Sequence, residues 1–272
     1  MICPGCFRHC HLDEGQLGFC KGRTCSHGMI VDSNYGKITS MALDPIEKKP
    51  LKMFHPGSYI LSIGSYGCNL CCPFCQNYEI SQRLLDQEAT AFTPEEIVAK
   101  ACHLKDQGRN IGIAFTYNEP MIGYEFVRDT SRLAKEKDLL TVLVTNGCFS
   151  LEALAEVKDS IDAMNIDLKG FTPEYFRYIG GDLEMTKAFI QEANKTSHVE
   201  LTTLVVPHHN DDLEAFEKEC QWISSVNPQM PLHITRYFPM YHEDEKMTPV
   251  KTLKEFAAIA SQYLRFVFIG NV

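Results

Sequence analysis

Seven short apolar runs, separated by stretches with helix signals, do most to limit how this chain of 272 residues can fold. Each run has the length and the Val, Ile, Leu and aromatic content of a buried strand. Strands that alternate with helices form parallel sheets covered by those helices. The pattern predicts an α/β fold, either a barrel or a doubly wound sheet. The runs occupy residues 59–65, 111–117, 139–145, 161–167, 199–206, 232–238 and 264–270.

The stretches between the runs carry recognisable helix starts. Thr93 can accept a hydrogen bond from the first turn of a helix, and Pro94 suits the first helical position because it lacks an N–H. Thr248 and Pro249 predict the same two roles for the last helix.

The chain divides into two parts of different composition. Residues 1–58 are turn-rich and contain five of the 12 cysteines, so they predict a cysteine-rich, metal-binding head. Within this part, residues 29–43 predict a β-hairpin and residues 44–57 a connector marked by prolines. Residues 59–272 contain all seven apolar runs and predict one large α/β domain.

Charge and apolar content exclude several classes of protein. A formal net charge of -9 and a pI near 5.6 argue against a nucleic-acid partner, because binding phosphates needs clustered Lys and Arg. No run is long enough to span a membrane, and the N-terminus does not read as a signal peptide. Twelve cysteines without such a signal predict metal or cluster ligation in a reducing cytoplasm.

The loop 66–77, YGCNLCCPFCQN, follows directly on the first strand of the α/β domain. Active sites of barrels and parallel sheets lie at the carboxyl ends of strands, so this position indicates function. The spacing of Cys68, Cys72 and Cys75 lets one loop direct three thiolates to a common point and leaves a fourth valence open, unlike a closed structural zinc site. We expect Cys71 to be a small buried apolar residue.

The pattern formed by Cys68, Cys72, Phe74 and Cys75 resembles the signature of the radical S-adenosylmethionine (SAM) superfamily. In that superfamily the three cysteines hold three irons of a 4Fe-4S cluster, and the amino and carboxylate groups of SAM chelate the fourth iron. The resemblance implies a partial (β/α)6 TIM-like barrel over residues 59–272, with Phe74 beside the adenine.

A wider resemblance covers nearly the whole chain. Residues 42–82, together with the segments TYNEP, TNG, NIDLKG, TTLVVP and IGNV, look like the radical enzyme of the AmmeMemoRadiSam system. That group is usually described as similar to pyruvate formate-lyase activating enzymes.

Five further residues are candidates for binding the cofactor. Asn118 and Glu119 stand where related enzymes carry a Gly-Gly-Glu type motif for the methionine amino group, and a carboxylate suits an ammonium; the alternative for Glu119 is a helix cap. Asp167 and Lys169 are two apart on a predicted strand, so we expect both to face the barrel interior, as SAM or substrate contacts or as a structural ion pair. Asn146 faces the nucleoside or merely belongs to a turn.

The head offers a second set of soft ligands in Cys3, Cys6, Cys10 and Cys20, with Cys25 spare. Their number and spacing predict a bound metal, which would stabilise a segment that has too little core to fold unaided. Zinc and a second iron-sulfur cluster both fit the spacing.

The resemblance implies reductive cleavage of SAM to a 5'-deoxyadenosyl radical, which then abstracts hydrogen from a protein or small-molecule substrate. It also implies a reductant such as flavodoxin or ferredoxin, and similarity to glycyl-radical enzyme activases. The alternative is a non-catalytic iron-sulfur or zinc protein with a redox or metal-binding role. No residue in the radical mechanism needs to act as a general base.

Overall fold

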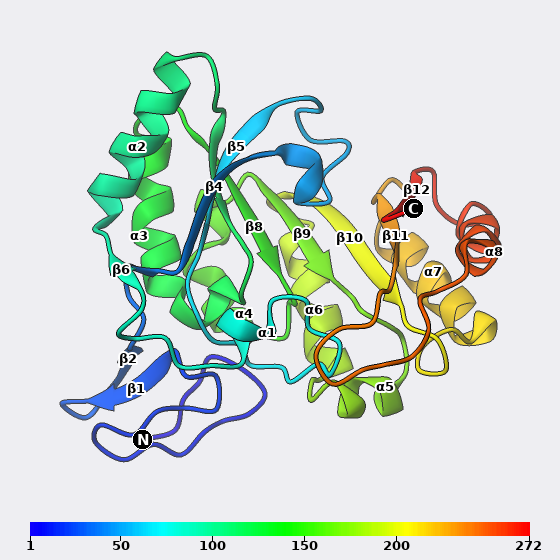
Figure 1. Ribbon diagram of the computed structural model, residues 1–272, viewed down its shortest axis with the longest axis horizontal. Coiled ribbons are helices and arrows are strands. Elements are labelled where there is room, and N and C mark those ends of the chain that lie inside the picture. The colour runs from blue at the N-terminus through cyan, green and yellow to red at the C-terminus, as the bar shows by residue number, and fades with distance from the viewer.

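All seven apolar runs form strands of one sheet in a computed structural model that describes residues 1–272 (Figure 1). The strand order is β12-β11-β10-β9-β8-β7-β5-β4. Neighbours from β5 to β12 pair parallel, and only the edge strand β4 pairs antiparallel, with β5. The outermost strands β4 and β12 do not pair with each other, so the sheet stays open. The α/β prediction is confirmed.

The elements follow one another as repeated βα units. The strands are β1 (Arg23–Ser26), β2 (Met29–Asp32), β3 (Lys37–Ile38), β4 (Ser40–Pro45), β5 (Tyr59–Gly64), β6 (Thr90–Ala91), β7 (Gly112–Phe115), β8 (Leu140–Thr145), β9 (Ala163–Asp167), β10 (His198–Val205), β11 (Leu232–Arg236) and β12 (Val267–Gly270). The α-helices are α1 (Tyr78–Ser81), α2 (Pro94–Asp106), α3 (Tyr124–Lys135), α4 (Leu151–Ala155), α5 (Pro173–Tyr178), α6 (Leu183–Ala193), α7 (Leu213–Val226) and α8 (Val250–Ala260). The 3₁₀ helices are η1 (Ile46–Lys48), η2 (Pro120–Gly123) and η3 (Lys158–Ser160). Each parallel strand from β5 to β11 is followed by a helix, and β12 ends the series.

The two predicted helix starts have different outcomes. Thr93 caps α2 in a reciprocal capping box with Glu96, and Pro94 is the first helical residue, as predicted. The start of α8 was placed one residue too early, because Pro249 is its cap. The Thr248 hydroxyl instead donates to the Val205 carbonyl, 2.6 Å away, and so ties the loop before α8 to β10. No helix combines the length and apolar character needed to cross a membrane.

The connector predicted at residues 44–57 runs across the inside of the sheet. Ile46 and Leu51 are fully buried against apolar residues from the inner faces of β5, β7, β8 and β9. The Asn165 amide donates to the Pro50 carbonyl at 2.9 Å, and the Glu200 carboxylate accepts hydrogen bonds from the backbone of residues 52 and 53. Residues 46–53 therefore close one end of the interior, and we call this segment the floor.

The predicted hairpin at residues 29–43 is wrong. β2 pairs with β1 through a turn at His27 and Gly28, both of which have positive φ. The Asn34 amide is buried and donates to the Tyr66 carbonyl at 3.0 Å, so the predicted turn docks on the start of the cysteine loop instead of joining two strands. In Figure 1 this N-terminal region lies at the end of the sheet where α1 lies.

Candidate functional site

A cleft of about 750 Å³ opens at the carboxyl ends of the parallel strands, and we call this end the mouth. Cys68, Cys72 and Cys75 all line the cleft, whereas Cys71 does not. The prediction that Cys71 is buried is wrong, because it is exposed and its thiol points to the Ile179 carbonyl, 3.6 Å away. One face of the loop therefore presents three thiols to the cleft.

The Asn118 side chain holds the start of the loop against β7. Its Oδ1 accepts from the Ser65 N–H at 2.9 Å, and its Nδ2 donates to the Gly67 carbonyl at 3.1 Å. These bonds use the amide oxygen and one N–H to fix the backbone just before Cys68. Asn118 also lines the cleft, yet its position is that of a residue that orients the loop.

A pair of buried asparagines, Asn69 and Asn146, supports Cys68. The Asn146 amide nitrogen lies 2.8 Å from Asn69 Oδ1 and 3.8 Å from Cys68 Sγ. Asn69 Nδ2 donates to the Cys148 carbonyl at 2.9 Å. Sequence reasoning included Asn146 but missed Asn69, although its place directly after the first loop cysteine was a usable signal.

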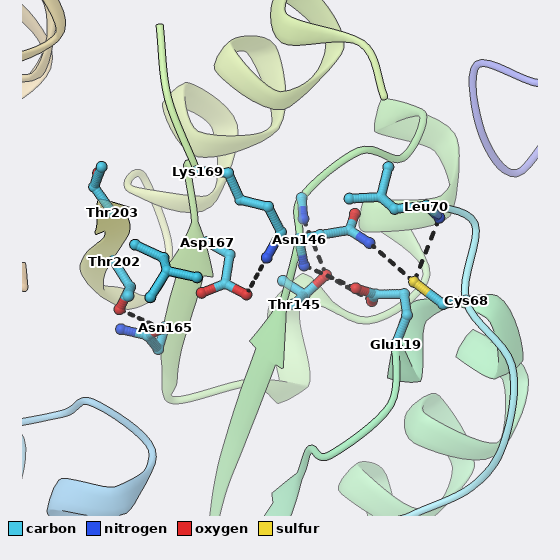
Figure 2. Close-up of polar contacts among 12 residues, drawn as sticks. Cys68, Leu70, Glu119, Thr145, Asn146, Asn165, Asp167, Lys169, Thr202 and Thr203 are labelled. Atoms are coloured by element: carbon cyan, nitrogen blue, oxygen red, sulfur yellow. Dashed lines mark hydrogen bonds and ion pairs between the residues drawn. The ribbon is translucent and has the colours of Figure 1, made fainter. Parts of the chain in front are cut away.

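Glu119 lies buried between the ends of β7 and β8 (Figure 2). Its carboxylate accepts from the Asn146 N–H at 2.7 Å, the Thr145 hydroxyl at 2.7 Å and the Met121 N–H at 3.0 Å. The last contact caps η2, as the alternative interpretation had it. Burial raises the pKa of Glu119 to about 7 against the opposing effect of these hydrogen bonds. No cationic side chain pairs with it.

Asp167 and Lys169 form an ion pair, with Lys169 Nζ 2.8 Å from Asp167 Oδ2. The strand ends at Asp167, and Lys169 follows it with a φ of +66°, so strand alternation is not what brings the two together. Burial alone would lower the pKa of Lys169, but the nearby Asp167 and Cys72 raise it above its ordinary value. A charged amine therefore stands beside the cleft thiols. Burial raises the pKa of Cys72 to about 12, while Lys169 favours its thiolate.

Phe74 lines the cleft and packs against two tyrosines that do not line it. Its ring lies parallel to that of Tyr175, with centroids 6.5 Å apart, and edge-on to Tyr237 at 6.4 Å. The Tyr175 hydroxyl is buried without a hydrogen-bond partner in the protein.

The segment between β11 and α8 covers the outside of the cysteine loop. The His242 N–H donates to the Pro73 carbonyl at 2.8 Å, and the Tyr241 ring stacks on Tyr78 with centroids 4.6 Å apart. The last third of the chain thus contacts both the loop and the helix that follows it.

The head cysteines meet at a separate cavity. Cys3, Cys6, Cys10 and Cys20 line it together, whereas Cys25 does not. No three His, Cys, Asp or Glu side chains of the protein stand close enough together to hold a single metal ion.

A family model of the radical SAM superfamily matches residues 62–220, more than half of the chain and the whole cysteine loop. The chain belongs to the radical SAM superfamily. Radical SAM proteins are in general enzymes that catalyse radical reactions, and the family uses SAM and a 4Fe-4S cluster, with a reductant and substrates that include peptides.

Two relatives come from Methanocaldococcus jannaschii. An uncharacterized protein is 38% identical over 276 residues, which cover 100% of this radical SAM chain and 80% of that protein. A putative glycyl-radical enzyme activating enzyme is 26% identical over 222 residues, or 76% of this chain and 87% of that one.

Solved radical SAM structures share the fold at low sequence identity. A domain of a pyruvate-formate lyase-activating enzyme from Bacteroides vulgatus matches 59% of this chain and 99% of its own, with a TM-score of 0.52 and 17% identity. SuiB from Streptococcus suis bound to SAM matches 78% of this chain and 51% of its own, with a TM-score of 0.60 and 12% identity. These likenesses bear out the partial TIM-like barrel.

The residues present fit the family's cofactors. Three thiols share the cleft, which matches a cluster whose fourth iron is left for another ligand. The Glu119 carboxylate lines the cleft, is buried and lacks a cation. A bound cationic cofactor supplies that partner.

Proposed function

We propose that this chain reductively cleaves SAM at a 4Fe-4S cluster held by Cys68, Cys72 and Cys75. The proposal depends on one observation, which is that the fold directs only some of the loop thiols into the cleft. Three of the four loop cysteines line the cleft, and the fourth, Cys71, faces away from it. That set is the one that the family signature requires.

A cluster held by Cys68, Cys72 and Cys75 would pass one electron from the external reductant to the sulfonium of SAM, and cleavage of a carbon-sulfur bond would then give methionine and the 5'-deoxyadenosyl radical needed for hydrogen abstraction. The chain's own part is to hold the loop rigid and to exclude water. Asn118 fixes the loop at its start, and the Asn146 and Asn69 pair supports Cys68.

The cofactor contacts follow from the charges at the mouth. Glu119 provides a buried negative charge for the methionine ammonium. Lys169 stands beside the thiols and favours their charged form, with Asp167 fixing its position. Phe74 and Asn146 border the cleft where the nucleoside would pack. An apolar ring and a buried amide suit an adenosine group.

Similarity to a putative glycyl-radical enzyme activating enzyme favours a protein substrate, such as a glycine loop presented to the open mouth. SuiB has been solved with its precursor peptide SuiA, an example of a radical SAM protein with a peptide partner. A small-molecule substrate is the other candidate. A flavodoxin or ferredoxin is the expected electron donor, and a reducing cytoplasm is the expected location because the thiols and cluster are oxygen-sensitive.

The test is anaerobic reconstitution followed by dithionite and SAM, with 5'-deoxyadenosine as the product measured. The intact protein should form the nucleoside, and Cys72→Ala should not. Cys71→Ala is the matched control, since it removes the adjacent thiol that faces away from the cleft. A full cluster with bound SAM but no nucleoside would overturn the proposal and leave a non-catalytic redox or metal-binding role.

A further inference from the structure

We propose that Cys3, Cys6, Cys10 and Cys20 hold a second iron-sulfur cluster beside the cysteine loop. This inference goes beyond the proposed function, because SAM cleavage requires only the loop cysteines.

The fold of the head brings the four thiols to one cavity from separate turns. A backbone hydrogen bond from the Cys3 N–H to the Cys10 carbonyl, 2.9 Å long, brings the first and third together. Cys20 arrives through the turn at Gly18, whose N–H donates to the Arg23 carbonyl at 2.8 Å. Cys25 is equally buried yet stays outside the cavity, so burial alone does not explain the grouping.

The spacing of the head thiols favours a cluster over zinc. Zinc binds thiolates at about 2.3 Å, so its four sulfurs converge on one point. No three of the head thiols are close enough to share one ion. The loop cysteines, whose family binds a 4Fe-4S cluster, share this wider spacing.

The charge around the cavity suits an anionic occupant. Arg8 lines it and donates to the carbonyls of Asn69, at 2.6 Å, and Gly180, at 2.8 Å, while its guanidinium stacks on Phe19 at 3.5 Å. No carboxylate pairs with Arg8. A cluster with four thiolates carries net negative charge and would supply the missing partner.

The cavity adjoins the cysteine loop directly. A Cβ on Gly67 would lie 2.2 Å from the Cys20 carbonyl oxygen, so the two backbones are in contact. Asn69 lines the head cavity, and its Oδ1 lies 4.0 Å from Cys68 Sγ. A cluster in the head could accept one electron from an external low-potential one-electron donor and pass it to the loop cluster, with no bond made or broken.

The decisive variant leaves the head untouched. In Cys68→Ala, Cys72→Ala, Cys75→Ala protein reconstituted with iron and sulfide, we expect about four irons and four sulfides per chain and an electron paramagnetic resonance signal after reduction. Cys6→Ser with Cys20→Ser should lose that share of iron, while Cys25→Ser should keep it. A loop variant without iron, or one that carries stoichiometric zinc in place of iron, would overturn the inference.

The loop variant also separates this inference from the proposed function. Iron in the loop variant together with no nucleoside from the intact protein would sink only the proposed function. Nucleoside from the intact protein with no iron in the loop variant would sink only the second cluster.

Discussion

Glu119, in the loop after β7 at the mouth, and Glu200, in β10 near the floor, are both buried, yet their surroundings shift their pKa values in opposite directions. Burial raises the pKa of Glu119 to about 7, and hydrogen bonds only partly offset it. Burial would also raise the pKa of Glu200, but hydrogen bonds from His198, His233 and two backbone N–H groups outweigh it and lower the pKa to about 2. The Glu200 carboxylate therefore has a hydrogen-bond partner on each side, whereas the Glu119 carboxylate has no cationic partner in the protein.

The contrast indicates that Glu200 stabilises the fold and that Glu119 is available for binding. Glu200 Oε2 lies 2.6 Å from His233 Nε2 and accepts from the Lys52 N–H at 3.0 Å, so one side chain joins two strands to the floor. The Glu200 carboxylate already binds protein groups through both oxygens, so we do not expect it to bind a ligand. Changes at the floor should therefore cost stability, and changes at the mouth should cost activity.

The largest effect should come from Cys72→Ala, with a loss of nucleoside formation of more than about 100-fold because one cluster ligand is gone. Melting temperature should change little. Cys71→Ala should retain activity. An equal loss of nucleoside formation in Cys71→Ala and Cys72→Ala would contradict the assignment of Cys72, and not Cys71, as the cluster ligand.

Glu119→Gln should weaken SAM binding by at least about tenfold, because a charge-assisted hydrogen bond to the ammonium is lost. Equilibrium binding to the reconstituted protein measures this directly. Glu47→Gln removes the same charge from another part of the cleft wall and should bind SAM normally. Unchanged affinity in Glu119→Gln would assign that residue to the cap of η2 alone.

Glu200→Gln should lower the free energy of unfolding by about 3 kcal/mol near neutral pH, because the pKa of Glu200 lies well below its ordinary value. A depressed pKa contributes stability that is present above pH 4.5 and is lost as the pH falls toward 2. Urea unfolding of both proteins between pH 7 and pH 3 should therefore show the gap narrowing. A constant gap would mean that packing, not charge, is what Gln disrupts.

Glu219→Gln should have the smallest effect and the opposite sign. Glu219 is buried in α7 with only the Thr203 hydroxyl as donor, and burial raises its pKa to about 7. Its ionisation destabilises the fold as the pH rises above 4.5, so the variant should be more stable by about 2 kcal/mol at pH 6 and equal to the wild type below about pH 4. Thermal unfolding at these two pH values measures the difference.

The sheet could be predicted because each buried parallel strand is a continuous apolar run, and all seven runs became strands. The three cleft cysteines stood out for a related reason, since their loop directly follows a strand. Pairing within the head was harder to foresee. β1, with the sequence RTCS, has no apolar alternation, and its partner β2 is chosen by the His27–Gly28 turn.

Side-chain contacts between distant segments also lay beyond the sequence. Asn118 and Asn69 are ordinary loop residues until the sheet places β5, β7 and β8 side by side. The Thr248 hydroxyl could cap a helix or bind a carbonyl, and only the nearness of Val205 decides between them. Cys71 was misplaced because the exposure of a thiol in a tight loop depends on which way the loop turns.

The cysteine loop is covered from both ends of the chain, by Cys20 against Gly67 and by His242 against Pro73. The three thiols open into the cleft, so these covers restrain the backbone of the loop, and the loop can rearrange around an incoming cluster only when one of them opens. The cover from residues 1–26 has a small apolar cluster of three buried residues and several isolated β-bridges, so it should open at the lower free-energy cost. The rate of cluster loading would then be set by the stability of the first twenty residues, far in sequence from the thiols being loaded.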